Sequence, residues 1–281
     1  MATGMSLHIG LNTVDPAHYQ GWDGQLAACE NDATSMETLA EALGYSPRTV
    51  LLTKDATARK VTAAIKKAAT KLVAGDTFFI SYAGHGGQVP DTNGDEARKA
   101  RNEVGELGDA YDETWLLYDR ELVDDELYQL WALFKPKVRV VMLSDSCHSG
   151  TVARPAPWDT ENVDPWPNRR IPLELQDRVY EANKRTYDGI QRKTKSRDEK
   201  AVKAGVILIS GCMDNQTSGD GPRNGRFTGQ LLEVWKDGRF KGTLPDLHKA
   251  IVATMPPYQT PNLYFVGGRD KTLSDRAAFA L

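Results

Sequence analysis

The 281-residue chain has only three cysteines, little net charge and no long apolar run. Three cysteines do not make a disulfide framework, so we expect a reducing, cytoplasmic environment. A net charge of −3 without a dense basic run gives no electrostatic reason to expect nucleic acid as a partner. Because no segment approaches membrane-spanning length and no basic segment followed by an apolar stretch opens the chain, we expect no membrane association.

The chain does have an alternation of short apolar runs with amphipathic helical patterns. The predicted strands are residues 7–11, 49–52, 77–82, 115–118, 138–143, 206–210 and 263–266. The predicted helices include residues 36–43, 61–72, 124–134, 227–235 and 244–253. Right-handed crossovers between such elements predict an α/β fold with a mostly parallel open sheet and helices on both faces. A hydrophobic content of 40% is enough for one substantial core and one structural domain.

Two short motifs follow strands of this predicted sheet. YAGHGG spans residues 82–87, and DSCHSG spans residues 145–150. In open parallel sheets the ligand crevice lies outside the carboxyl ends of the strands, where His85 and Cys147 both fall. A nearby imidazole can take the proton of a thiol or hold it as thiolate. The pair predicts a cysteine hydrolase, although no third member is obvious.

Asp145 indicates which substrate side chains this chemistry would favour. It precedes Cys147 by two residues, so its side chain faces the same way if the strand continues that far. A carboxylate beside the nucleophile favours a cationic substrate side chain. The alternative is that Cys147 is a small buried hydrophobic residue and that His85 is a satisfied core histidine.

Both motifs resemble those of the metacaspases and their bacterial relatives, the caspase-like cysteine peptidases of peptidase family C14. The resemblance spans most of the chain, since CENDA at 29–33, DAYDET at 109–114 and ISGCMDNQTS at 209–218 also match. One departure is Ala83, where many members have Ser. The Gln-Ala-Cys string of caspases is absent, which argues against aspartate specificity.

The resemblance implies a caspase-like fold and a division of the chain. Residues 1–150 correspond to a large-subunit (p20) region that contains His85 and Cys147, and residues 205–281 correspond to a small-subunit (p10) region. Residues 151–204 would be a linker or insertion, and their prolines and charges predict an exposed connection. Metacaspases tend to be monomers, so the resemblance also implies a monomer.

The implied activity is that of an endopeptidase cleaving proteins after Arg or Lys, with no cofactor required for the chemistry. By resemblance, Asp32, Asp145 and Ala83 would form the S1 pocket, and the backbone donors of Gly86 and Cys147 would hold the oxyanion. Asp32 has an alternative role, because a carboxylate at the start of a helix stabilises its free backbone donors. A non-catalytic signalling or scaffold module with the same fold is the rival function.

Basic pairs in the predicted linker raise the hypothesis of self-cleavage. A pocket that prefers cationic side chains makes these pairs natural sites. The candidate residues are Arg170, Arg185 and Lys193, in the pairs 169–170, 184–185 and 192–193. The alternative is a charged, solvated insertion.

An acidic segment between residues 91 and 113 raises the question of calcium. Asp91, Asn93 and Asp95 have the D-x-N-x-D spacing of a calcium loop, although the rest of an EF-hand is missing. The resemblance implies calcium as an activator, held by acidic residues after the histidine motif: Asp95, Asp109, Asp112 and Glu113. The alternative is a polar surface loop.

Overall fold

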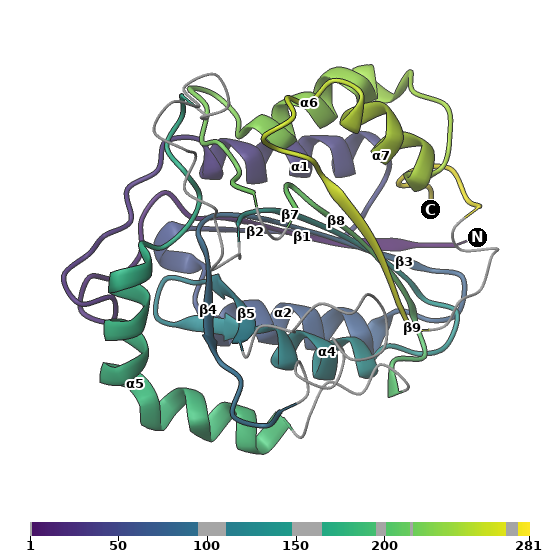
Figure 1. Ribbon diagram of the computed structural model, residues 1–281. Coiled ribbons are helices and arrows are strands. Elements are labelled where there is room, and N and C mark those ends of the chain that lie inside the picture. The colour runs from purple at the N-terminus through teal and green to yellow at the C-terminus, as the bar shows by residue number, and fades with distance from the viewer. Residues whose placement is uncertain (1, 95–110, 148–164, 195–200, 214–215, 268–274) are drawn as a thin grey trace.

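A six-stranded sheet in the order β2-β1-β3-β7-β8-β9 forms the centre of the computed structural model (Figure 1). The first five strands run parallel, and β9 is antiparallel to β8. This arrangement confirms the predicted α/β fold. The strands are β1 (Gly4–Gly10), β2 (Arg48–Leu52), β3 (Thr77–Ala83), β7 (Arg139–Asp145), β8 (Gly205–Ser210) and β9 (Asn262–Gly267). The structure describes residues 2–94, 111–147, 165–194, 201–213, 216–267 and 275–281.

Helices cover both faces of the sheet, as predicted (Figure 1). One face carries α1 (Cys29–Ala42), α6 (Arg226–Trp235) and α7 (Leu244–Val252), and the other carries α2 (Ala58–Lys71) and α4 (Asp124–Ala132). Two short 3₁₀ turns, η1 (Thr53–Asp55) and η4 (Lys236–Gly238), complete this set. None of the helices in the described part of the chain combines the length and apolar character needed to cross a bilayer.

The apolar residues of the central strands alternate between the two faces. On β3, Phe78 and Ile80 belong to the core under α2 and α4, whereas Phe79 belongs to the core under α1, α6 and α7. Because both faces are buried, the strand reads as a continuous apolar run, which is typical of parallel sheets. This burial fixes the register of β3 and β7, and therefore places the chain segments that follow them side by side.

A second, three-stranded antiparallel sheet was not predicted. It consists of β4 (Gly86–Pro90), β5 (Tyr111–Leu116) and β6 (Glu121–Val123). The predicted strand at 115–118 therefore begins earlier, in β5, and lies outside the main sheet. The sequence of β4, GGQVP, has few of the β-branched and aromatic residues that mark strands, and its pairing with β5 is what makes it one.

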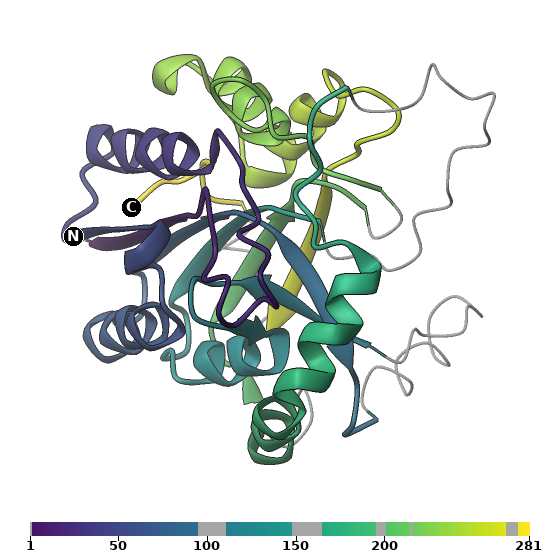
Figure 2. The same ribbon diagram turned by 90° about the vertical axis from the view of Figure 1, so that its left-hand side faces the viewer.

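Residues 173–194 form helix α5 (Leu173–Thr194), which is partly buried where an exposed connection was predicted. The helix lies beside β4 (Figure 2). Its Tyr187 side chain is fully buried, and the hydroxyl lies 2.7 Å from Nε2 of His18. Charged residues dominate the helix and interrupt its apolar face, which explains why the pattern suggested a solvated segment.

Replacing Tyr187 tests whether α5 is part of the folded core. We expect Tyr187→Ala to lower the free energy of unfolding by about 3 kcal/mol or more, because it leaves a cavity and removes a buried hydroxyl contact. Arg185→Ala, on an exposed position of the same helix, should change it by less than about 0.5 kcal/mol. Urea unfolding of both variants provides the measurement. Equal effects would show that α5 does not pack as described.

Candidate active site

His85 lies in the turn between β3 and β4 and is almost fully buried. Its Nε2 is 3.0 Å from the carbonyl oxygen of Gly24. A carbonyl oxygen only accepts hydrogen bonds, so Nε2 carries the hydrogen and Nδ1 of the neutral ring keeps its lone pair. The Trp22 ring packs against the imidazole, with 4.8 Å between ring centroids. The ring is thus held in one tautomer and orientation.

Burial also sets the protonation state of this histidine. It lowers the pKa of His85 to about 4, because the positive form of the ring loses its hydration. Above that pH the imidazole is neutral and can accept a proton. The Gly24 carbonyl acts as the orienting third group that the sequence did not reveal.

Cys147 follows the neighbouring strand, β7, and is also buried. Ala83 and Asp145 are paired at the ends of β3 and β7, so the histidine and cysteine motifs leave the sheet side by side. The backbone N–H of Ser218 donates to Sγ of Cys147.

The carbonyl oxygen of Arg169 lies between two backbone donors from these motifs. It accepts from the N–H of Gly86 at 3.0 Å and from the N–H of Cys147 at 3.1 Å. Two N–H groups from different strands therefore converge on one oxygen atom. The Gly86 and Cys147 donors named from the sequence form one site.

The side chain of Arg169 fills an acidic pocket beside this oxygen. Its guanidinium is 2.6 Å from Asp32, 3.0 Å from Asp145 and 2.9 Å from Asp220. All four side chains are at most 2% exposed. One cation is thus enclosed by three carboxylates, and ion pairs in such a dry environment are far stronger than on a surface.

The protein backbone and hydroxyl groups hold the carboxylates in position. The Asp145 carboxylate accepts from the N–H of Thr228 at 3.0 Å and from the hydroxyl of Ser218 at 2.5 Å. The N–H of Gly225 donates to Asp32. A Cβ on Gly225 would lie 2.4 Å from Nη1 of Arg169, so only glycine leaves room for the guanidinium.

Asp32, Asp145 and Ala83 line a cavity of about 210 Å³. The three residues proposed for S1 from the sequence therefore share one pocket. Burial raises the pKa of Asp32 to about 6, and the neighbouring Asp145 carboxylate adds to this, whereas the Arg169 guanidinium acts in the opposite direction. The Arg169 cation thus offsets only part of the effect of burial on the pKa of Asp32.

The backbone around Arg169 pairs on both sides. The Arg169 N–H donates to the carbonyl of Ser218 at 3.0 Å, and the Ile171 N–H donates to the carbonyl of Gly86 at 3.1 Å. The segment thus bridges the histidine motif and the loop before α6, through Arg170 on one side and Asn168 on the other, with a bend at Arg169 between them.

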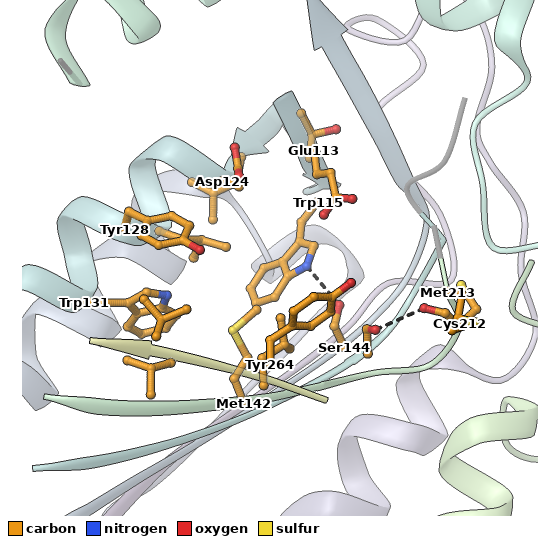
Figure 3. Close-up of a pocket in the computed structure, with 17 residues that line it drawn as sticks. Glu113, Trp115, Asp124, Tyr128, Trp131, Met142, Ser144, Cys212, Met213 and Tyr264 are labelled. Atoms are coloured by element: carbon orange, nitrogen blue, oxygen red, sulfur yellow. Dashed lines mark hydrogen bonds between the residues drawn. The ribbon is translucent and has the colours of Figure 1, made fainter. Parts of the chain in front are cut away.

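Other predicted residues lie elsewhere. Arg170 is half-buried next to this segment, whereas Arg185 and Lys193 occupy exposed positions on α5. Asp112 is buried on β5, and its neighbour Glu113 lines a different pocket (Figure 3). Asp95 and Asp109 lie outside the described residues.

No group of three or more His, Cys, Asp or Glu side chains suited to a metal occurs within the described ranges. Adjacent residues on a strand point to opposite faces, so Asp112 and Glu113 do not face one common point from β5.

Asp220 and Arg169 are the functional residues that sequence reasoning missed. Asp220 follows the matched segment 209–218 by two residues, and no spacing links it to Asp32 or Asp145. Arg169 belongs to a basic pair that was singled out, but only the folded chain places its side chain in the pocket.

Comparisons with known proteins give the family and the fold of this chain. A family model described as caspase domain matches residues 13–272. Metacaspase-1A of Aspergillus fumigatus is 32% identical over 258 residues, which cover 80% of this chain and 58% of that protein. Metacaspase-1 of Cryptococcus neoformans is also 32% identical, with 80% and 53% covered. The chain therefore spans little more than half the length of these relatives.

Two solved structures share the fold. The crystal structure of protein GSU0716 from Geobacter sulfurreducens has a TM-score of 0.86 and 49% identity, and the match covers 98% of this chain and 97% of that one. Caspase-1 from Spodoptera frugiperda has a TM-score of 0.55 at 11% identity, with 99% and 89% covered, and supports the fold alone.

The protonation state and the tautomer of the His85 imidazole can be measured directly. We expect ¹⁵N NMR of the imidazole to show a neutral ring with the hydrogen on Nε2 from pH 5 upward, because burial lowers the pKa to about 4. Trp22→Ala admits water to the ring and should move the titration upward. A wild-type ring that titrates between pH 6 and 7, as an exposed histidine does, contradicts the described burial.

Proposed function

We propose that this chain, which belongs to the family of caspase domains, is a metacaspase-type cysteine endopeptidase that cleaves proteins after Arg or Lys. The observation that carries the proposal is the position of Arg169. Its guanidinium fills the acidic pocket while its carbonyl oxygen lies between the Gly86 and Cys147 donors. A basic residue at P1, the position before the cleaved bond, needs this same combination.

The proposed reaction is acyl transfer. Nδ1 of His85 takes the proton of Cys147, and the sulfur attacks the carbonyl carbon after the basic residue. The N–H groups of Gly86 and Cys147 hold the developing oxyanion, and losing one such donor typically costs about 100- to 1,000-fold in rate. His85 then gives the proton to the departing amine, and water releases the acyl group from the sulfur.

A non-catalytic scaffold is the less favoured function. A scaffold needs neither two donors converging on one oxygen nor three buried carboxylates around a cation, and buried charges are costly to keep. Both features are explained by a substrate site.

The same contacts favour self-cleavage at one bond. The segment around Arg169 is outside any helix and its backbone is paired on both sides, so its carbonyl can lie against the Gly86 and Cys147 donors as that of a peptide substrate would. Arg185 and Lys193 lie within helix α5, where the backbone is hydrogen-bonded internally and cannot pair in this way. The bond between Arg169 and Arg170 is therefore the proposed processing site.

Self-cleavage can be tested by incubating the purified chain and identifying new termini by mass spectrometry. We expect wild type to give fragments ending at Arg169 and beginning at Arg170, and Cys147→Ala and Arg169→Ala to give neither. Arg185→Ala is the matched control and should cleave as wild type does. A cysteine-dependent cut elsewhere, with residues 169–170 intact, would overturn the assignment.

Basic specificity depends on the carboxylates. We expect Asp145→Asn and Asp32→Asn to lower kcat/KM for Arg and Lys peptides by about 100-fold or more, because each leaves a buried substrate cation short of a partner. Glu41→Gln, on the exposed face of α1, is the control. A panel of fluorogenic peptides with every residue type at P1 provides the measurement, and undiminished Arg cleavage by both variants would refute the pocket.

The ionisation of Asp32 should make the activity of the same site toward Arg peptides depend on pH. Protonation removes the negative charge that attracts the substrate, so kcat/KM for Arg peptides should fall as the pH drops and Asp32, whose pKa burial raises, becomes protonated. In Asp32→Asn this limb of the profile should be absent. An unchanged low-pH limb in the variant would assign it to another group.

Calcium activation stays a prediction, and so do the cytoplasmic location and the monomeric state. Calcium activation is tested by assaying the same peptides in calcium and in EGTA. We expect activity to fall in EGTA and Asp112→Ala to weaken the response to calcium, since a carboxylate is a preferred calcium ligand. Equal activity of wild type in both buffers would remove calcium from the account.

A further inference from the structure

A second sulfur lies against the nucleophile. Sγ of Cys212 is 3.5 Å from Sγ of Cys147, and both side chains are buried. Cys212 lies two residues beyond Ser210, the last residue of β8, which is paired with Ser144 near the end of β7. The N–H of Gly211 donates to the carbonyl of Ser144 at 2.8 Å. The main sheet therefore fixes the two sulfurs next to each other.

We propose that Cys147 and Cys212 form a reversible disulfide when a peroxide reaches the site. The bond would occupy the sulfur that attacks the substrate. The consequence for peptidase activity rests on the proposed function, but the formation of the bond does not.

The step balances with hydrogen peroxide as the oxidant. The Cys147 thiolate attacks one peroxide oxygen, the O–O bond breaks, and sulfenic acid and water result once a proton is taken up. The Cys212 thiol then loses its proton and attacks the Cys147 sulfur, which expels hydroxide as a second water. Two thiols and one peroxide thus give a disulfide and two waters. A dithiol reductant reverses the step by exchange.

The geometry requires only a small adjustment. A disulfide is about 2.05 Å long, so the sulfurs must approach by about 1.5 Å from their separation of 3.5 Å. Both cysteines lie beyond the ends of their strands, where side chains and backbone move at less cost than within the sheet.

A pocket gives a small oxidant access from the side of Cys212. This pocket has a volume of about 780 Å³, and its lining includes Cys212, Met213 and Tyr264 (Figure 3). The Met213 side chain is 42% exposed, so this end of the pocket meets solvent. Cys147 does not line this pocket, and its sulfur lies 3.5 Å beyond that of Cys212, so a peroxide that enters here passes Cys212 to reach Cys147.

The third cysteine provides a matched control. Sγ of Cys29 lies 3.9 Å from a carboxylate oxygen of Asp220. Burial raises the pKa of the Cys29 thiol well above its usual range, so it stays protonated and reacts slowly. Oxidation should therefore be confined to the other two cysteines.

The test is peptide mapping after treatment with one equivalent of hydrogen peroxide, with the remaining thiols blocked by iodoacetamide and digestion without reductant. We expect a cross-linked peptide pair containing Cys147 and Cys212, two hydrogens lighter than the two thiol peptides, and loss of both thiols at the same rate. Cys29→Ser should behave as wild type. In Cys212→Ser, Cys147 should proceed to sulfinic acid.

Activity provides a second readout. Wild type should lose its peptidase activity with the two thiols and regain it in dithiothreitol, whereas oxidised Cys212→Ser should not regain its own starting activity. The proposal would be overturned if Cys147 were oxidised while the Cys212 thiol still reacted with iodoacetamide, in both wild type and Arg169→Ala. Because the cross-link is scored by mass, a chain without peptidase activity refutes the proposed function and leaves the disulfide to be judged on its own.

Discussion

Three buried carboxylates around one guanidinium are the interaction on which the rest of the site depends. Asp32 comes from the first turn of α1, Asp145 from the end of β7 and Asp220 from the loop before α6. Removing one partner of a buried ion pair typically costs about 3–5 kcal/mol, because the other charge is left without compensation. Arg169 therefore links three elements of the fold, and its loss would leave their buried carboxylates without a cation. The pocket needs a cation, and its own chain supplies one.

The tethered arginine follows the path that the proposal assigns to a substrate. Its carbonyl meets Gly86 and Cys147, and its backbone pairs with Ser218. A tethered group has an effective concentration of the order of millimolar, so an external peptide competes at a disadvantage until the segment leaves. The proposed function thus makes the intact chain both a peptidase and its own first substrate, and it makes the release of residues 166–171 the step that admits others.

The sequence was sufficient to predict the residues of the site that lie at the ends of strands. His85, Cys147 and Asp145 could be assigned to one edge because each directly follows a buried strand, and Asp32 entered through the family motif. Asp220 could not be found in this way, because it reaches the pocket from a loop, where its carboxylate accepts from the N–H groups of Ala27 and Ala28 just before α1. Helix α5 was missed for another reason, since its few apolar contacts are separated by charged residues and become visible only against β4.

Occupation of the proposed substrate pocket by Arg169 can be tested by labelling Cys147 with an arginyl chloromethyl ketone. Iodoacetamide, which needs no pocket, serves as the reference reagent. We expect Arg169→Ala to raise the ratio of the two labelling rates about 100-fold or more over uncleaved wild type, because the tethered competitor is gone. Circular dichroism checks that the variant is folded. The same ratio in both proteins would contradict the account.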